Sequence, residues 1–423
     1  MKILILCDVR WFNANAWHAV GLAEELVAQG HDVWFAARAD SPPGKQAAAR
    51  GLRVVDLHLE RAGPGRLLRG VRALVELARR EGIEVFDAHR AEGFLAAAIA
   101  ARGVGRPLAV VRTRSDIRAP KSHWLNRLLH RRGAHAIGAA ANFMCAEFAA
   151  LGVGRDRVRV VYPGVILDEF VPGSTRAEAA ALRARLGASA AGGGAAMPGA
   201  ADAGQGVASA GPSAASASAD ARPAAPGAAP RALVGVVGRL TAVKGHAVFI
   251  DAAARLAARR PDMHFVIAGE EWDVPRAGLA ERAAAHGIAD RVHFLDRLPD
   301  VRPLLEALDA VVVPSTGSEA VSRVALEAMA LARPVVASAV GSLPELLDED
   351  AGVLVPPGDA DALADALDRV LSDPAGAEEM GWRGRRRLET YFTRDRAARA
   401  TVDLYADALR RAARIDWTRR HHQ

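Results

Sequence analysis

The sequence predicts an α/β protein made of two doubly wound domains that face each other across a central cleft. Three observations lead to this prediction. Short apolar stretches alternate with segments of helical periodicity, the alternation restarts after a segment of low complexity, and 423 residues exceed what one ordinary hydrophobic core holds. Strands separated by helices indicate βαβ units and therefore a parallel sheet in each domain.

The first half contains seven apolar stretches that predict strands. Between them, Ala16–Gln29 and Leu67–Glu81 have helical periodicity and end before Gly30 and Gly82, because glycine is favoured just beyond the C-terminus of a helix. The predicted strands are Lys2–Cys7, Val33–Ala37, Arg53–Leu57, Val85–Ala88, Leu108–Val111, Ala134–Ala139 and Arg157–Val161.

A segment of very simple composition separates the two halves. Of the 43 residues from Ala188 to Pro230, all but six are Ala, Gly, Ser or Pro. Such a segment offers too little apolar surface to bury, so we expect a flexible insert or linker. The expected bounds are 1–187 for the first domain, 188–230 for the insert, 231–393 for the second domain, and 394–423 for a C-terminal helix and basic tail that can pack back on the first domain.

The second half repeats the pattern. An open sheet of this kind binds ligands beyond the carboxyl ends of its strands, so we expect the site there. Helices are predicted at Ala247–Ala258, Val321–Ala332 and Ala360–Leu371, and an amphipathic helix at Arg394–Arg414. The predicted strands are Ala232–Val237, Met263–Ala268, Val292–Leu295, Ala310–Val313, Pro334–Ser338 and Gly352–Val355.

Composition and cysteine content restrict the class of protein. A hydrophobic fraction of 51% and a charged fraction of 25% are typical of a soluble globular chain, and no apolar stretch is long enough to span a membrane. The N-terminal apolar run is too short for the core of a signal peptide. Cys7 and Cys145 are far apart and lack metal-like spacing. These features predict a cytoplasmic protein with free thiols.

The net charge of +6 is distributed unevenly. Residues 1–186 hold 28 Lys and Arg against 18 Asp and Glu, whereas the remainder holds 27 against 31. A basic first half suits a phosphorylated acceptor, an anionic membrane surface or nucleic acid. Compositional bias explains the charge equally well, since the chain has 51 Arg and only four Lys. Nucleic-acid binding is not favoured, because no recognition motif or interleaved aromatic residues accompany the charge.

Two glutamates separated by seven residues follow a predicted strand of the second half. Glu319 falls in the turn before a helix, where backbone N–H groups are unpaired, and Glu327 falls within that helix. At the helical rise per residue their Cα atoms are about 12 Å apart, too far for two acids that flank one glycosidic bond. The spacing suits one carboxylate on a sugar and the other on a ribose. Alone, a glutamate near a helix N-terminus also serves the helix dipole.

A basic turn follows the first strand of the same domain. It begins at Gly238, carries Arg239 and Lys244, and ends at Gly245. Arginine binds a diphosphate through two parallel hydrogen bonds and lysine binds it as a point charge. Neither a P-loop nor a dinucleotide-binding fingerprint is present. For either cation alone, a solvated turn would be the simpler interpretation.

Taken together, these motifs resemble glycosyltransferase family 4, the retaining "group 1" glycosyltransferases of the GT-B fold, which has two Rossmann-like domains. The motifs occur in the family's order over about 120 residues, and Val160–Val165 (VVYPGV) is similar to the family's strand-to-linker signature. The resemblance covers most of the chain except the Ala/Gly/Ser insert. The matching segments are GRL-x-x-x-KG, FVIAGE, RVHFLDRL, DAVVVPS, E-x7-E, RPVVAS and GVLVPPGD.

The resemblance implies a nucleotide-sugar donor, with UDP, GDP and ADP all possible, and neither an obligatory cofactor nor a metal. It implies that Arg239 and Lys244 neutralise the departing diphosphate. Glu319 would hold the transferred sugar, Glu327 would accept the ribose hydroxyls, and backbone amides after Glu319 would cradle phosphate and sugar. The implied donor-binding residues are Gly238, Arg239, Lys244, Glu319, Ala320, Val321 and Glu327, of which Arg239, Lys244 and Glu319 would be catalytic.

The chain departs from the family pattern at several positions. Ala320 and Ala332 stand where glycine is usual, and Ser342 stands where a second glycine is common. The Gly-Gly loop that often follows the first strand is replaced by Trp11–His18 (WFNANAWH), and the usual cleft histidine after the strand Leu108–Val111 is absent. The candidates to line the cleft in its place are His89, Arg112 and Arg114, although a single histidine at a strand end is more often structural.

One basic segment concerns the acceptor. Between Arg114 and Arg132, apolar residues such as Trp124 and Leu128 alternate with cations at helical spacing. The segment fits an interfacial helix that faces a lipid-linked acceptor, or equally a core-facing helix with a basic solvent side. Similar stretches accompany family members that build lipopolysaccharide, which weakly favours a peripheral position on the inner face of the membrane.

The sequence therefore predicts a retaining glycosyltransferase that moves a sugar from a nucleoside diphosphate to a cell-envelope glycan or glycolipid. The first domain would bind the acceptor and the second the donor, with hinge closure completing the site. Two alternatives stay open. One is a sugar-nucleotide epimerase of the same fold, which needs no acceptor, and the other is a catalytically silent scaffold that binds nucleotide.

Overall fold

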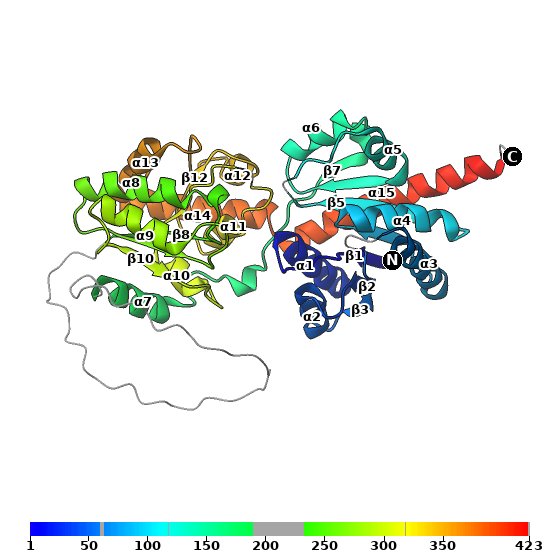
Figure 1. The fold of residues 1–423 in the computed structure, drawn as a ribbon, viewed down its shortest axis with the longest axis horizontal. Coiled ribbons are helices and arrows are strands. Elements are labelled where there is room, and N and C mark those ends of the chain that lie inside the picture. Colours follow the sequence, from blue (N-terminus) through cyan, green and yellow to red (C-terminus); the bar gives the residue numbers. More distant parts are fainter. Residues whose placement is uncertain (60–62, 117, 189–231, 318, 422–423) are drawn as a thin grey trace, which may run out of the picture.

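The computed structural model describes residues 1–59, 63–116, 118–188, 232–317 and 319–421. It contains two α/β bodies, each built on one parallel sheet (Figure 1). Except for Ala188, the segment predicted as an insert lies outside the described residues. No helix in the described ranges has both the length and the apolarity to cross a bilayer.

The first body is a sheet in the strand order β3-β2-β1-β4-β5-β6-β7, with every pairing parallel. The order reverses between β1 and β4, which makes this the switch point of a doubly wound sheet. Its strands are β1 (Lys2–Leu6), β2 (Asp32–Ala37), β3 (Arg53–Asp56), β4 (Val85–Ala88), β5 (Ala109–Arg114), β6 (Ala136–Ala139) and β7 (Val158–Val160). Its helices are α1 (Ala14–Ala28), α2 (Pro42–Ala49), α3 (Pro64–Glu81), α4 (Ala91–Gly103), α5 (Trp124–Gly133) and α6 (Phe143–Ala150).

The second body has the order β10-β9-β8-β11-β12-β13, again parallel throughout. Its switch point lies between β8 and β11. The strands are β8 (Leu233–Val237), β9 (His264–Ala268), β10 (Val292–Leu295), β11 (Ala310–Val313), β12 (Val335–Ser338) and β13 (Val353–Val355). The helices are α8 (His246–Arg259), α9 (Arg276–Ala285), α10 (Arg302–Ala307), α11 (Arg323–Ala330), α12 (Leu343–Leu346), α13 (Ala360–Ser372) and α14 (Pro374–Tyr391).

Apolar side chains from both faces of each sheet form the cores. Strand residues such as Ile3, Leu4, Val311 and Val312 are fully buried, because helices cover each sheet on both sides. Strands buried on both faces read as continuous apolar runs, which is why the sequence located them. The predicted fold class, two Rossmann-like sheets, is confirmed.

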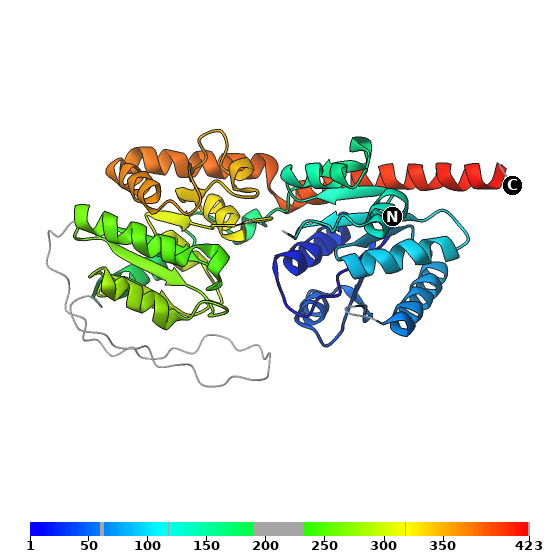
Figure 2. The same cartoon turned by 45° about the horizontal axis from the view of Figure 1, so that its top comes forward.

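Two helices come shortly after the points where the chain passes from one body to the other. α7 (Arg176–Ala188) belongs to the predicted first domain but packs against α10 of the second body, where Arg183 Nη2 lies 2.8 Å from Asp309 Oδ2. α15 (Arg394–His421) starts at the junction and runs along the first body, in contact with α1, β5 and β6 (Figures 1 and 2). The two chain segments that pass between the bodies also pair there: Val165 N–H donates to the Phe392 carbonyl, and Arg394 N–H donates to the Val165 carbonyl.

Strand β5 differs from its prediction. We expected it to end at Val111, with Arg112 and Arg114 in the loop that follows. The strand instead continues to Arg114, and both arginines are buried within it. They remain in the sheet because their guanidinium groups find partners: Arg112 donates to the carbonyl of Ala88, and Arg114 pairs with Glu147.

Candidate active site

The segments that follow β8, β9, β10 and β11 bound a cavity of about 760 Å³ between the two bodies. Most of its lining comes from the second body, while the first contributes the start of α1 and the segment that ends in Phe170. A cavity at the switch point of a doubly wound sheet is the expected ligand site of this architecture. Of the predicted donor residues, those that line it are Gly238, Arg239, Lys244, Val321 and Glu327.

The basic turn is shaped by a short 3₁₀ helix, Ala242–Lys244, between β8 and α8. Gly245 closes this turn at φ 70°, and a Cβ there would lie 1.9 Å from the carbonyl oxygen of Pro314. Only glycine fits this close approach, which brings the turn against the loop after β11. The turn therefore delivers Lys244 to the residues that precede α11.

Lys244 and Glu319 form an ion pair on this wall of the cavity. Lys244 Nζ donates to Glu319 Oε1 at 2.5 Å, and Ser315 Oγ donates to the same oxygen at 2.6 Å. Glu319 itself is only 5% exposed and lies behind Lys244, together with Ala320, rather than on the cavity surface. The pair places an ammonium group at the cavity and fixes its position through a buried carboxylate.

Glu327 lines the cavity one helical turn into α11. It is 5% exposed, and Arg323 Nη2 donates to its Oε1 at 2.8 Å. Burial raises the pKa of the Glu327 carboxyl, while Arg323 acts in the opposite direction. Glu319 lies four residues before α11 begins, outside the helix. The separation of about 12 Å, which counted both glutamates as helical, is therefore not a valid estimate.

Arg239 is exposed and rests on an aromatic ring. Its Cζ lies 4.6 Å from the ring centroid of Trp272, in the loop after β9. Trp272 meets Trp11 of the first body edge-to-face, at 6.2 Å between centroids. The sequence analysis did not single out Trp272, because a tryptophan outside any motif gives no signal of its own.

Arg323 is another cavity residue that the sequence analysis did not single out. Its Cζ lies 4.9 Å from the ring centroid of Trp17 on α1, so its side chain reaches from the second body to the first. It lies within the E-x7-E motif, and its four-residue spacing from Glu327 was the available signal for a helical ion pair.

The three candidates for the first-domain side of the cleft do not line the cavity. His89 is fully buried, with its Nε2 3.3 Å from Asp87 Oδ2. Burial in β5 lowers the pKa of Arg112 to about 10, and Arg114 is 1% exposed. His89 instead supports α1, because its carbonyl accepts a hydrogen bond from Asn15 Nδ2 at 2.9 Å.

No group of His, Cys, Asp or Glu within the described ranges is arranged to hold a metal ion. Two Asp-x-Asp triplets, 348–350 and 359–361, do occur in the sequence. Asp359 has a structural role, because its carboxylate caps α13 by accepting the N–H of Ala362 at 2.9 Å. That the reaction needs no metal stays a prediction.

Each half of the chain matches a known family model. Residues 16–169 match the model of Glycosyltransferase Family 4, and residues 231–373 match that of the group 1 glycosyl transferases. A D-inositol 3-phosphate glycosyltransferase of Salinispora tropica is 42% identical over 188 residues, 42% of this chain and 38% of that protein. The lipopolysaccharide core mannosyltransferase LpsB of Rhizobium meliloti is 32% identical over 183 residues, 42% of this chain and 52% of that protein.

Solved structures show the same fold over nearly the whole chain. HepE of Anabaena, in complex with UDP, superposes with a TM-score of 0.77 at 20% identity, covering 96% of this chain and 100% of that one. The matches to the two curated relatives, in contrast, span about two fifths and about half of those proteins' lengths.

Proposed function

The chain belongs to the group 1 glycosyltransferases of family 4, and we propose on that premise that it transfers a sugar from a nucleoside diphosphate to a cell-envelope glycan or glycolipid, with retention of anomeric configuration. The observation that carries the proposal is the Lys244–Glu319 ion pair on the wall of a cavity that Arg239 and Glu327 also line. Structural neighbours crystallised with UDP and UDP-glucose support a nucleotide-sugar donor.

The chemistry follows from where charge develops. When the bond between sugar and diphosphate breaks, negative charge accumulates on the leaving group, and cations already fixed beside it lower the barrier. Lys244 is held by Glu319, and Arg239 is held by Trp272. Glu327 would accept hydrogen bonds from the ribose hydroxyls, and the N–H groups at the start of α11 would face the phosphates.

A transfer assay separates this function from its alternatives. The purified chain is incubated with UDP-, GDP- and ADP-glucose in the presence and absence of two acceptor preparations, lipopolysaccharide core oligosaccharide and inositol 3-phosphate. We expect release of nucleoside diphosphate that depends on one acceptor and falls with Glu327→Ala. Conversion of the free nucleotide sugar without acceptor would favour an epimerase, and binding without either reaction would favour a silent scaffold.

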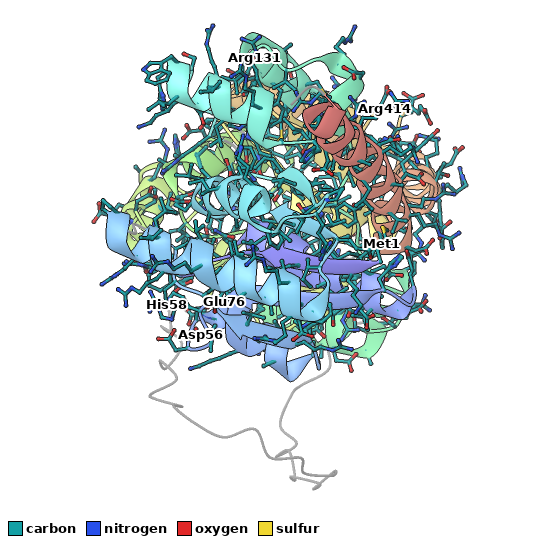
Figure 3. All side chains as sticks on the ribbon, turned by 90° about the vertical axis from the view of Figure 1, so that its right-hand side faces the viewer. Met1, Asp56, His58, Glu76, Arg131 and Arg414 are labelled. Carbon is teal, nitrogen blue, oxygen red and sulfur yellow. The ribbon has the colours of Figure 1, made fainter. Side chains whose placement is uncertain are left out.

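The acceptor side of the proposal rests on a basic and apolar surface around α5. Trp124, Leu125 and Leu128 are 70%, 54% and 41% exposed, so this helix turns large apolar side chains to solvent. Residues 117–146 contain five Lys and Arg and no Asp or Glu. Figure 3 looks onto the end of the molecule that carries this helix, where Arg131 is labelled. We propose that this surface docks on an anionic membrane, where each cation near the surface contributes about 1 kcal/mol.

Vesicle co-sedimentation tests the docking surface. Wild-type protein should sediment with vesicles of phosphatidylcholine and phosphatidylglycerol, and salt should weaken the association because it screens the charges. The double variant Trp124→Ser with Leu125→Ser should lose it. Trp382→Ser removes another exposed tryptophan, on α14 of the second body, and should leave it unchanged. Equal binding by wild type and the double variant would refute the assignment.

A further inference from the structure

Arg323 connects three parts of the molecule that the reaction must bring together. It is the first residue of α11, its side chain lines the cavity, and it donates to Glu327 at 2.8 Å. Its guanidinium group also stacks on Trp17, which belongs to α1 of the first body. A single side chain thus joins a carboxylate of the donor cavity to the other body across the cleft.

Glu327 depends on this arginine for its charge. The carboxylate is nearly buried, and burial disfavours ionisation. Two other carboxylates face it, Glu169 and Asp300, and both also raise its pKa. Asp300 is itself paired with Arg302, whose Nη2 lies 2.7 Å from Asp300 Oδ2. Among the groups with the largest influence on Glu327, Arg323 favours its ionised form.

Trp17 fixes where the arginine can lie. The indole is 9% exposed, and Arg394, at the junction between the bodies, approaches the same ring to 5.6 Å. Arg394 is in turn paired with Glu24 of α1 at 3.2 Å. The Arg323 side chain is 43% exposed and would otherwise move freely in solvent. Stacking on the Trp17 ring restricts that movement. The contact makes the geometry at Glu327 dependent on the first body.

We propose that Arg323 is a positioning residue for nucleoside recognition: it holds the Glu327 carboxylate ionised and oriented toward the ribose hydroxyls, and Trp17 of the first body holds Arg323. The inference rests on the proposed function, in which Glu327 binds the ribose. An ionised carboxylate accepts hydrogen bonds from two hydroxyls, whereas its protonated form has one acceptor oxygen fewer. Nucleotide binding would therefore require a residue of the acceptor-side body even though that residue does not touch the nucleotide.

Equilibrium binding separates this role from direct contact with phosphate. The probes are UDP, GDP and ADP, and the 2′,3′-dideoxy form of whichever binds wild type most tightly. Arg323→Gln should weaken the ribonucleotide on the order of tenfold, as expected for a lost hydrogen bond to a charged group, and should barely affect the dideoxy form. Arg323→Lys should restore part of the loss. Equal weakening of both nucleotides would place Arg323 on the diphosphate and overturn the proposal.

A pH profile supplies a readout that a purely structural role would not move. It uses the glucose conjugate of the preferred nucleotide, whose phosphates do not titrate near neutrality. Without Arg323 the pKa of Glu327 should rise further, so as the pH is lowered the affinity of Arg323→Gln should begin to fall at a higher pH than that of wild type. Trp17→Leu should shift the profile in the same direction, and Trp17→Phe, which retains a ring, should shift it less. Coincident pH profiles of Arg323→Gln and wild type would overturn the proposal.

Glu327→Gln distinguishes the failure of this inference from the failure of the function. If this variant binds the ribonucleotide as tightly as wild type, or if wild type binds none of the probes, the donor site itself is misassigned. If Glu327→Gln weakens binding and Arg323→Gln does not, the donor site stands and only the role of Arg323 is refuted. If instead the proposal holds, the variant with both substitutions should bind the ribonucleotide no more weakly than Glu327→Gln alone.

Discussion

Two glutamates of one motif occupy different environments. Glu319 is buried behind Lys244 and accepts hydrogen bonds from Lys244 Nζ and Ser315 Oγ. Glu327 faces the cavity and is paired with an arginine that solvent also reaches. Both carboxylates are thus paired with cations, which lowers the energetic cost of keeping them buried.

Lys244→Ala should mainly reduce turnover. Because the leaving group carries more negative charge in the transition state than in the bound donor, loss of this cation should lower kcat by about 10²- to 10³-fold and change the KM for the donor little. Steady-state kinetics with varied nucleotide sugar provides the measurement, with the melting temperature as a control of folding. A kcat within twofold of wild type would remove Lys244 from the reacting diphosphate.

Ala332 adopts a left-handed backbone conformation, with φ 53°. This is one of the positions where the family resemblance leads us to expect glycine, and a side chain there costs about 1 kcal/mol. Ala332→Gly should therefore raise the stability of the second body by roughly 0.5–1 kcal/mol in denaturant titration. Ala330→Gly makes the same chemical change two residues earlier, at the end of α11, and should destabilise instead. Destabilisation by both would contradict the assignment of strain to Ala332.

At the scale of single residues, the motifs predicted donor-side positions better than cleft-side ones. Arg239, Lys244 and Glu327 line one cavity because they follow two adjacent strands at the switch point, a relation that sequence order reveals. His89 and Arg112 do not, because their surroundings come from other elements, such as the ring of His18 on α1 beside His89 and the carbonyl of Ala88 beside Arg112. Pairing between distant elements leaves no local pattern in the sequence.

At the scale of elements, the loop between β11 and α11 carries Glu319 and leads into the helix that carries Glu327. Gly341, on the segment after β12, fixes the position of this loop. It has φ 56°, and an added Cβ would lie 2.1 Å from the carbonyl oxygen of Glu319. Ser342 N–H donates to that same oxygen at 2.7 Å. The loop is therefore clamped against the segment after β12.

Gly341→Ala should displace this loop and lower kcat/KM by about 10²-fold, as a shift near 1 Å is enough to misalign reacting groups. Gly358→Ala is the matched control. Gly358 is also left-handed, at φ 78°, but an added Cβ would meet nothing within 4 Å. Both variants should lose some thermal stability, and only Gly341→Ala should lose activity. Comparable kinetics for the two would show that the clamp does not control the site.

The strands were the most predictable elements, and several helices were not. Continuous apolar runs mark doubly buried strands, so the predicted strands match the observed ones within about two residues at most ends. Helix α4 was missed because most of its residues are apolar or small, which weakens the helical periodicity. The α5 segment was left open between two interpretations, and its exposed Trp124 and Leu125 favour the interfacial one.

At the scale of the whole molecule, contacts on both rims of the cleft join the two bodies. Besides the Trp17–Arg323 and Trp11–Trp272 contacts, Glu345 of α12 accepts hydrogen bonds from Asn142 N–H at 2.9 Å and from Tyr162 Oη–H at 2.9 Å. Some of these groups, such as Trp11 and Trp272, are exposed, as expected where bodies move relative to each other.

Glu345→Ala should release one rim of the cleft. More molecules should have their two bodies apart, so the radius of gyration in small-angle X-ray scattering should rise. The decrease in the radius of gyration on addition of nucleotide sugar should also be larger than in wild type. Glu349→Ala serves as control, because Glu349 pairs with Arg387 inside the second body. Indistinguishable scattering from wild type and Glu345→Ala would mean that this contact does not hold the bodies together.

The order of elements predicted the two bodies but not how the chain divides between them. Helix α7 precedes the low-complexity segment yet packs on α10, where Arg183 pairs with Asp309. Such docking is set by side-chain pairs more than 100 residues apart in the sequence. The C-terminal α15 returns to the first body, where Tyr405 Oη–H donates to the buried Asp87 at 2.6 Å. Neither contact has a local signature.

The central claim is that a nucleoside diphosphate binds in the cavity beside Arg239 and Lys244, and a thermal-shift titration with UDP, GDP and ADP tests it most directly. A ligand that binds only the folded state adds about 2.7 kcal/mol of stability at 100 times its dissociation constant. We predict a clear upward shift of the melting temperature with one of the three nucleotides, and its loss in Arg239→Ala. No shift with any of them, or an equal shift in wild type and Arg239→Ala, would contradict the account.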